Sequence, residues 1–143
     1  LGAAVGLGSL WVYDAILNKR RENLYYLIEN FERFVPCLVT IKKETYEEIG
    51  PHALPIIIQE KAKFTRAQLV NYLEKRGIDT RTLFSSMPTQ CHGFGYLGHK
   101  IGDFPNAEYI GENGIHIGVH QDLGRQECDF ILNTIEKFLQ DHA

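Results

Sequence analysis

Apolar residues recur at three- and four-residue intervals over the first quarter of the chain, from position 3 to position 34. This spacing predicts one long helix, because it places the apolar side chains along a single helical face. Gly2, Gly6 and Gly8 weaken its first turns and also permit the close approach of another backbone. We therefore expect the small-residue end of this helix to pack on a domain or subunit outside the chain.

The rest of the chain alternates between short apolar runs and helical patterns. The β-branched run at 55–58 predicts a buried strand. Thr65 and Gln68 have the spacing of a capping box that opens a helix, and Gly77 is placed to end that helix. Further elements are predicted as strands at 78–83 and 115–119, a short helix that opens at Pro105 and a closing helix at 126–138.

These elements define the predicted fold class. The chain is expected to be α+β, with a long N-terminal helix followed by a small three-stranded sheet covered by helices. Residues 35–51 contain a short apolar run and then charged and turn residues. They are expected to form a connector that holds one extended piece at most.

Charge and length change this picture little. The chain has 143 residues, enough for one domain, and a net charge of −3 at pH 7. The basic run at 19–21 is followed at once by Glu22, which is typical of a solvated helix face. We therefore expect no nucleic-acid partner.

The cysteines and the chain start indicate the compartment. Cys37, Cys91 and Cys128 are widely spaced, so they predict neither a disulfide framework nor a zinc knuckle, and a reducing, cytoplasmic setting is expected. Trp11 and Asp14 interrupt the apolar start, which predicts neither a signal peptide nor a membrane span. Because the first residue is not Met, we expect a processed product, a trimmed form or a fragment.

The segment from 77 to 123 carries most of the candidate chemistry, since long loops that mix glycine, histidine and aromatic residues commonly line a site. Arg81 leaves the second predicted strand, where its guanidinium is able to pair with a carboxylate or phosphate; the alternative is a structural ion pair. His120 ends the third predicted strand before the last helix, whose N-terminus favours negative charge. It is a candidate for contact with a ligand hydroxyl or phosphate, or alternatively a cap of the loop.

Between these two positions the chain is rich in glycine. Residues 93–98 have the glycine spacing of a dinucleotide-binding motif, but no helix is predicted to begin there, as that motif requires. The segment is either a mobile flap whose Phe94 and Tyr96 pack on a ligand ring, or a surface loop that these two side chains anchor. Further on, Asp103, Asn106 and Glu108 are expected to serve turns and caps.

Metal binding and nucleophilic catalysis find little support in the sequence. Cys91 and the histidines at 92, 99 and 116 fit no zinc spacing, and His116 alternates with isoleucines as a solvent-facing strand residue would. We predict no metal site and no catalytic residue within this chain.

Several of these stretches together resemble the C-terminal small domain of the DegT/DnrJ/StrS family, the sugar aminotransferases that depend on pyridoxal 5′-phosphate (PLP). The residues that carry the resemblance are LPIII at 54–58, FTR at 64–66, LVNYL at 69–73, GIDTR at 77–81, Leu83 with Phe84, GDFPNAE at 102–108 and IGVH at 117–120. They look closest to the branch that contains the nucleotide-linked 4-keto-6-deoxyhexose 3-dehydratases. The opening GAAVGL at 2–7, with Leu10, Arg20 and Arg21, resembles the interdomain helix of the family.

The resemblance implies a division into an interdomain helix at 1–34 and a small domain at 35–143. In that family the large N-terminal domain supplies the Schiff-base lysine, and none of the lysines here matches it. PLP is therefore expected in the intact enzyme but not on this chain alone. The intact enzyme is expected to form a homodimer and to transfer an amino group from an amino acid, often glutamate, to a nucleotide-linked keto-sugar. The substrate-binding candidates in this chain are Arg81, Phe94, Tyr96 and His120.

Two alternatives stay open. One is the 3-dehydratase chemistry of the neighbouring branch, in which a histidine replaces the Schiff-base lysine at a position outside this chain. The other is a stand-alone, non-catalytic α+β binding module with no cofactor.

Overall fold

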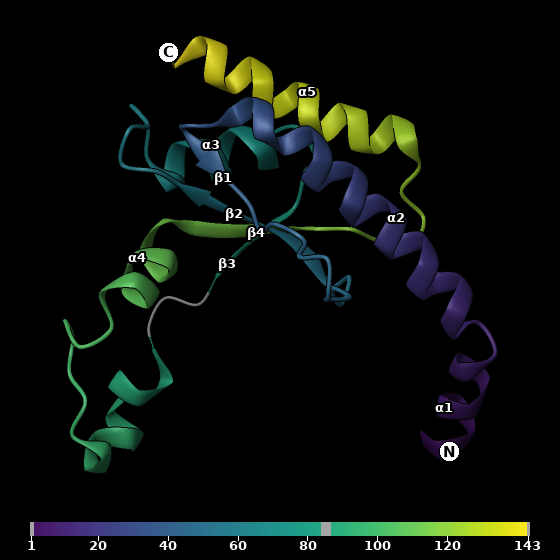
Figure 1. Cartoon of the computed structure of the whole chain (residues 1–143), viewed down its shortest axis with the longest axis horizontal. Coiled ribbons are helices and arrows are strands. Elements are labelled where there is room, and N and C mark those ends of the chain that lie inside the picture. The colour runs from purple at the N-terminus through teal and green to yellow at the C-terminus, as the bar shows by residue number, and fades with distance from the viewer. Residues whose placement is uncertain (1, 84–86, 143) are drawn as a thin grey trace.

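A computed structural model describes residues 2–83 and 87–142, and it places a layer of helices over one face of a small sheet (Figure 1). The sheet is antiparallel throughout, in the order β1-β2-β4-β3. Its strands are β1 (Leu38–Val39), β2 (Ala53–Ile58), β4 (Gly114–Gly118) and β3 (Thr80–Thr82). The helices over its face are α2 (Tyr13–Phe31), α3 (Arg66–Glu74) and α5 (Arg125–Asp141).

The predicted α+β class is confirmed, but the predicted number of strands is wrong. β1 lies within the stretch expected to be a connector and pairs with the end of β2, with Leu38 opposite Ile58 and Val39 opposite Ile57. Two residues are too few to show an alternating pattern. The strand exists because Leu38, which is fully buried, joins the core that β2 and the helices form.

The core follows from alternation in the two central strands. Leu54, Ile56 and Ile58 of β2 are buried, as are Ile115 and Ile117 of β4. Helices α2 and α5 cover this apolar face with residues that recur at helical spacing. Those buried residues are Leu24, Leu27 and Phe31 of α2, and Ile131, Leu132, Ile135 and Phe138 of α5.

The prediction of a single long N-terminal helix is wrong. It is divided at positions 11–12 into α1 (Gly2–Leu10) and α2, and α2 continues into a 3-10 turn at Glu32–Phe34. No residue of α1 is buried, so no packing offsets the weak helix propensity of its glycines. The Ser9 hydroxyl also donates to the carbonyl of Val5, a bond that often bends a helix.

The remaining elements match their predictions apart from their ends. Thr65 and Gln68 form the predicted capping box at the start of α3, and Gly77 follows that helix with φ +79°, a conformation that glycine adopts without strain. Pro105 opens α4 (Pro105–Asn113), which lies where β2 ends and β4 begins. Phe84 of the family resemblance lies outside the described residues.

Two parts of the chain extend away from the helical layer. Figure 1 shows α1 and the segment 87–104, hereafter the arm, reaching to the same side of the sheet, opposite α5. Among the described helices, none combines the length and apolar character that crossing a bilayer requires.

The stability of this fold is expected to depend on the seam between α5 and the sheet. Replacing the fully buried Ile135 with alanine should lower the free energy of unfolding by about 2–5 kcal/mol, because a cavity replaces packed methyl groups. The matched change Ile101→Ala removes the same atoms from a side chain that is 83% exposed, and should cost less than about 0.5 kcal/mol. Denaturant unfolding of both variants measures the difference, and equal losses would contradict the assigned core.

Candidate functional site

Arg81 lies on the edge strand β3, where its Cα pairs with that of His116 on β4. Its guanidinium is 3.1 Å from the Asp79 carboxylate and also donates to the Thr80 carbonyl at 3.1 Å. The structural ion pair weighed from sequence is therefore present. Both partners are exposed, 69% for Arg81 and 75% for Asp79, so the pair contributes little stability and the guanidinium is accessible to a ligand.

His120 lies just beyond β4, on the rim of a cavity of about 270 Å³ between the sheet edge and α5. Its Nδ1 accepts from the backbone N–H of Asp122 at 3.3 Å and lies 3.4 Å from that residue's carboxylate. Asp79, the partner of Arg81, lines the same cavity, whereas Arg81 itself does not. The cavity walls are mainly apolar, with Ile78, Ile117, Leu123, Phe130 and Ile131 beside the polar groups of Asp79, His120 and Glu127.

The N-terminus of α5 has a partner of its own. Glu127 reaches back to the backbone N–H of Gly124 at 2.8 Å, in the manner of a capping box. The Glu127 carboxylate therefore partly neutralises the positive end of the helix dipole, which weakens its effect on His120 or on a ligand.

Asn23 is a supporting residue that the sequence did not indicate. It is 4% exposed on α2, and its Nδ2 donates to the carbonyls of His120 at 2.8 Å and Leu123 at 3.1 Å. These two hydrogen bonds hold the backbone of the loop between β4 and α5 and therefore fix the position of His120. The only sequence signal was a polar residue on the apolar face of a helix, almost a hundred positions before the loop that it holds.

Phe94 and Tyr96 lie on the arm, which contains two 3-10 turns, at Pro88–Gln90 and His92–Leu97. Their ring centroids are 6.4 Å apart, and both side chains are exposed. Figure 1 shows these turns at the far end of the arm, away from the sheet and from α5. Two of the four candidates thus belong to the sheet, with Arg81 on β3 and His120 just beyond β4, and the two aromatics lie on the arm.

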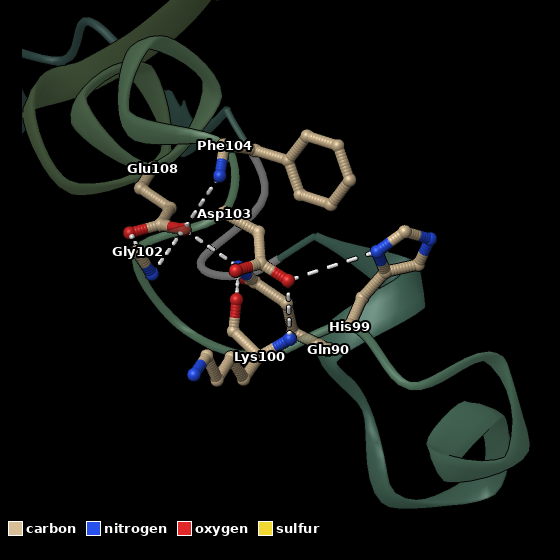
Figure 2. Close-up of polar contacts among 7 residues, drawn as sticks. All are labelled: Gln90, His99, Lys100, Gly102, Asp103, Phe104 and Glu108. Atoms are coloured by element: carbon tan, nitrogen blue, oxygen red, sulfur yellow. Dashed lines mark hydrogen bonds and ion pairs between the residues drawn. The ribbon is translucent and has the colours of Figure 1, made fainter.

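Glu108 on α4 holds the two ends of the arm together (Figure 2). Its carboxylate accepts from the Gln90 amide at 2.6 Å, from the Gly102 backbone N–H at 2.8 Å and from the Phe104 backbone N–H at 3.2 Å. The hydrogen bond from Gln90, followed by that from Gly102, lowers the pKa of Glu108 below its ordinary value of 4.5. The predicted turn-and-cap role is confirmed, and the bond to Gln90 extends it across the arm.

A second carboxylate shapes the same turn. Asp103 accepts from the Lys100 backbone N–H at 2.9 Å and lies 3.7 Å from Nδ1 of His99, whose ring packs on Phe104 with centroids 5.0 Å apart. Figure 2 shows His99 and Glu108 on opposite sides of Asp103. Within residues 2–83 and 87–142, no three His, Cys, Asp or Glu side chains are grouped so as to hold a metal ion.

Comparison with known proteins gives one family. Residues 1–136 match the model of the DegT/DnrJ/EryC1/StrS aminotransferase family, which confirms the resemblance predicted from sequence. The chain is 30% identical over 140 residues to the dTDP-4-dehydro-2,6-dideoxy-D-glucose 3-dehydratase of Saccharopolyspora spinosa, covering 97% of this chain and 30% of that protein. It is 25% identical to the GDP-perosamine synthase of Escherichia coli O157:H7, covering 97% of this chain and 36% of that protein.

Solved structures agree with this assignment. The GDP-4-keto-6-deoxy-D-mannose-3-dehydratase of Escherichia coli with bound hydrated PLP matches with a TM-score of 0.76 and 26% identity, over 92% of this chain and 33% of that one. The sugar aminotransferase CalS13 of Micromonospora echinospora has the same fold, with a TM-score of 0.78 at 17% identity, over 95% of this chain and 34% of that one. The chain spans about a third of the length of the relatives it matches.

The arm should depend on the charge of Glu108. In Glu108→Gln the neutral amide accepts more weakly than the carboxylate, so the amides of Gly102 and Phe104 should exchange with solvent about tenfold faster, measured by hydrogen exchange with NMR detection. Glu112→Gln, on the exposed side of the same helix, is the matched control and should leave both amides unchanged.

The pH dependence of the same contact has a definite sign. Because the pKa of Glu108 is lowered in the folded protein, its contribution is complete above pH 4.5 and is lost as pH falls through the lower folded value. In acid, the hydrogen-exchange protection of the Gly102 and Phe104 amides in the native protein should therefore fall to the level measured in the Glu108→Gln variant. A native protein whose amides keep their extra protection there would contradict the role of the charge.

Proposed function

Because this chain belongs to the DegT/DnrJ/EryC1/StrS aminotransferase family, we propose that it is the C-terminal part of a PLP-dependent enzyme that aminates a nucleotide-linked keto-sugar. The observation that carries the proposal is the extent of the match. Nearly the whole chain aligns with about a third of relatives whose names specify nucleotide-linked sugars as substrates or products. The domain division at 34/35, the homodimer and the cytoplasmic location belong to the same proposal.

The cavity beside His120 does not fit PLP by itself. PLP enzymes hold the cofactor through a lysine Schiff base and a charged partner of the pyridine nitrogen, and the bound cofactor acts as an electron sink. No lysine lines the cavity beside His120 in the part of the chain that the structure describes. We propose, as the family resemblance implies, that the cofactor is held by another part of the intact enzyme.

The role proposed for this chain is to bind and orient the substrate. Arg81 and His120 would hold polar groups of the nucleotide-linked sugar at the sheet edge, with the apolar cavity wall limiting the access of water. The arm would present Phe94 and Tyr96 to a sugar or base ring, since aromatic faces pack well on flat or apolar ligand surfaces.

Helix α1 is the element that we propose joins the two parts. Its apolar residues are largely exposed, with Val5, Leu7 and Leu10 each more than 60% accessible, and Trp11 in the turn that follows is 89% accessible. An apolar patch of this kind on a soluble domain is typical of a surface that another element covers. The preceding part of the enzyme is its proposed cover.

A second function is supported by the names of the relatives. The dTDP-sugar relative and the Escherichia coli structure at 26% identity are both 3-dehydratases. The resemblance places the residue that separates dehydration from amination, a histidine instead of the Schiff-base lysine, outside this chain. Reading that position in the preceding sequence decides between the two reactions.

The aromatic contact proposed for the arm has a direct test in the PLP-loaded full-length enzyme. In Tyr96→Ala the KM for the nucleotide-linked sugar should rise about three- to tenfold with kcat little changed, because a packing contact made equally in ground and transition states is lost. Tyr46→Ala is the matched control, since Tyr46 is 86% exposed on the segment before β2, and Tyr96 is 80% exposed. Equal KM values for both variants would count against the arm as a substrate wall, and an enzyme inactive on every nucleotide-linked keto-sugar would contradict the proposed function itself.

A further inference from the structure

The face of the sheet opposite the helical layer carries a cluster of one arginine and two histidines, Arg81, His116 and His52. His116 of β4 alternates with the buried Ile115 and Ile117 and so projects from this face, where it is half-buried. Arg81 is its register partner on β3, and Pro55 is its partner on β2. Sequence alternation predicted the direction of His116 but gave no reason to join it to Arg81.

A second histidine completes the cluster. His52 lies just before β2, and its ring meets that of His116 edge to face, with centroids 5.8 Å apart. Arg20 of α2 approaches the same residue and donates to the carbonyl of His52 at 2.8 Å. Strand pairing and ring packing therefore bring two imidazoles and one exposed guanidinium together from three separate segments.

The charges in this cluster are poorly balanced. Burial, followed by the nearby His52 and Arg81, lowers the pKa of His116 below 6.5. The carboxylate that pairs with Arg81 is Asp79, in a largely exposed contact at 3.1 Å that a competing anion is able to displace. An anion placed between the rings and the guanidinium would remove the repulsion and accept hydrogen bonds from all three groups.

We propose that Arg81, His116 and His52 form a binding site for an oxyanion group, a phosphate or a carboxylate. Arg81 would supply two parallel N–H donors, the geometry that matches two oxygens of such a group. Each imidazole would add one donor, and the half-buried position of His116 would strengthen its bond relative to one in bulk water. The site deepens the proposed function and rests on it for the source of the oxyanion, which is either the diphosphate of the nucleotide-linked sugar or a carboxylate of the amino-acid donor.

The test uses the chain itself, with inorganic pyrophosphate and glutamate as probes at mildly acidic pH. Imidazole NMR signals of His52 and His116 should shift saturably with the preferred anion, and the pKa of His116 should rise, because a bound anion favours its charged form. Arg81→Gln and His116→Gln should each weaken binding about tenfold, whereas His92→Gln, a change at an exposed histidine of the arm, should leave it unchanged. Unchanged chemical shifts elsewhere confirm that the variants are folded.

The anion that binds more tightly identifies the source of the oxyanion. Preference for pyrophosphate supports a phosphate ligand, and preference for glutamate supports a carboxylate ligand. If neither anion shifts His52 and His116, or if the two variants bind like the native chain, the proposed site is overturned. If pyrophosphate binds here while no nucleotide-linked sugar does so in the full-length enzyme, the oxyanion site stands and the proposed function fails.

Discussion

The arrangement of this chain depends on the burial of one face of β2 and β4 beneath α2 and α5. The register pairs Leu54 with Ile117 and Ile56 with Ile115, so that all four side chains face the helices. Because side chains alternate along a strand, a shift of one residue would turn this apolar set to solvent and carry His116 into the core. The same constraint that forms the core therefore fixes which polar groups appear on the opposite face.

Local patterns predicted most of the fold, and long-range pairing accounts for what they missed. The capping box of Thr65 and Gln68 spans three residues, and the strand alternation in β2 is visible in the sequence itself. By contrast, β1 forms because Leu38 pairs with Ile58, twenty residues further along the chain. The helix break after α1 is a second example, since no residue of α1 is buried by the rest of the described chain. Periodicity shows that a helical face is apolar, but it does not show whether that face is covered.

The same distinction between local patterns and long-range contacts applies to the candidate site. The sequence identified Arg81, His120 and the arm aromatics as separate candidates, each from its local context. It did not identify Asn23, whose two hydrogen bonds hold the loop of His120, or the reach of Glu108 to Gln90 across the arm. Positioning residues of this kind make contacts that only the folded chain creates, so a single sequence holds little trace of them.

The two groups of candidates differ in how firmly they are held, and this bears on what each is able to do. Arg81 is tied into the sheet through β3, and the backbone around His120 is fixed by the buried Asn23, so their positions follow from the core. The aromatics lie on an exposed arm whose two ends are joined through the Glu108 carboxylate. Rigid groups suit the recognition of a charged or polar moiety, in which direction and distance matter, whereas an arm closed at its base suits a less directional apolar contact. Arg81 and His116 of the proposed oxyanion site lie on paired strands, and His52 directly precedes a third strand. Since the chain as a whole carries a net charge of −3, that cluster reflects local placement by the register and not a general excess of positive charge.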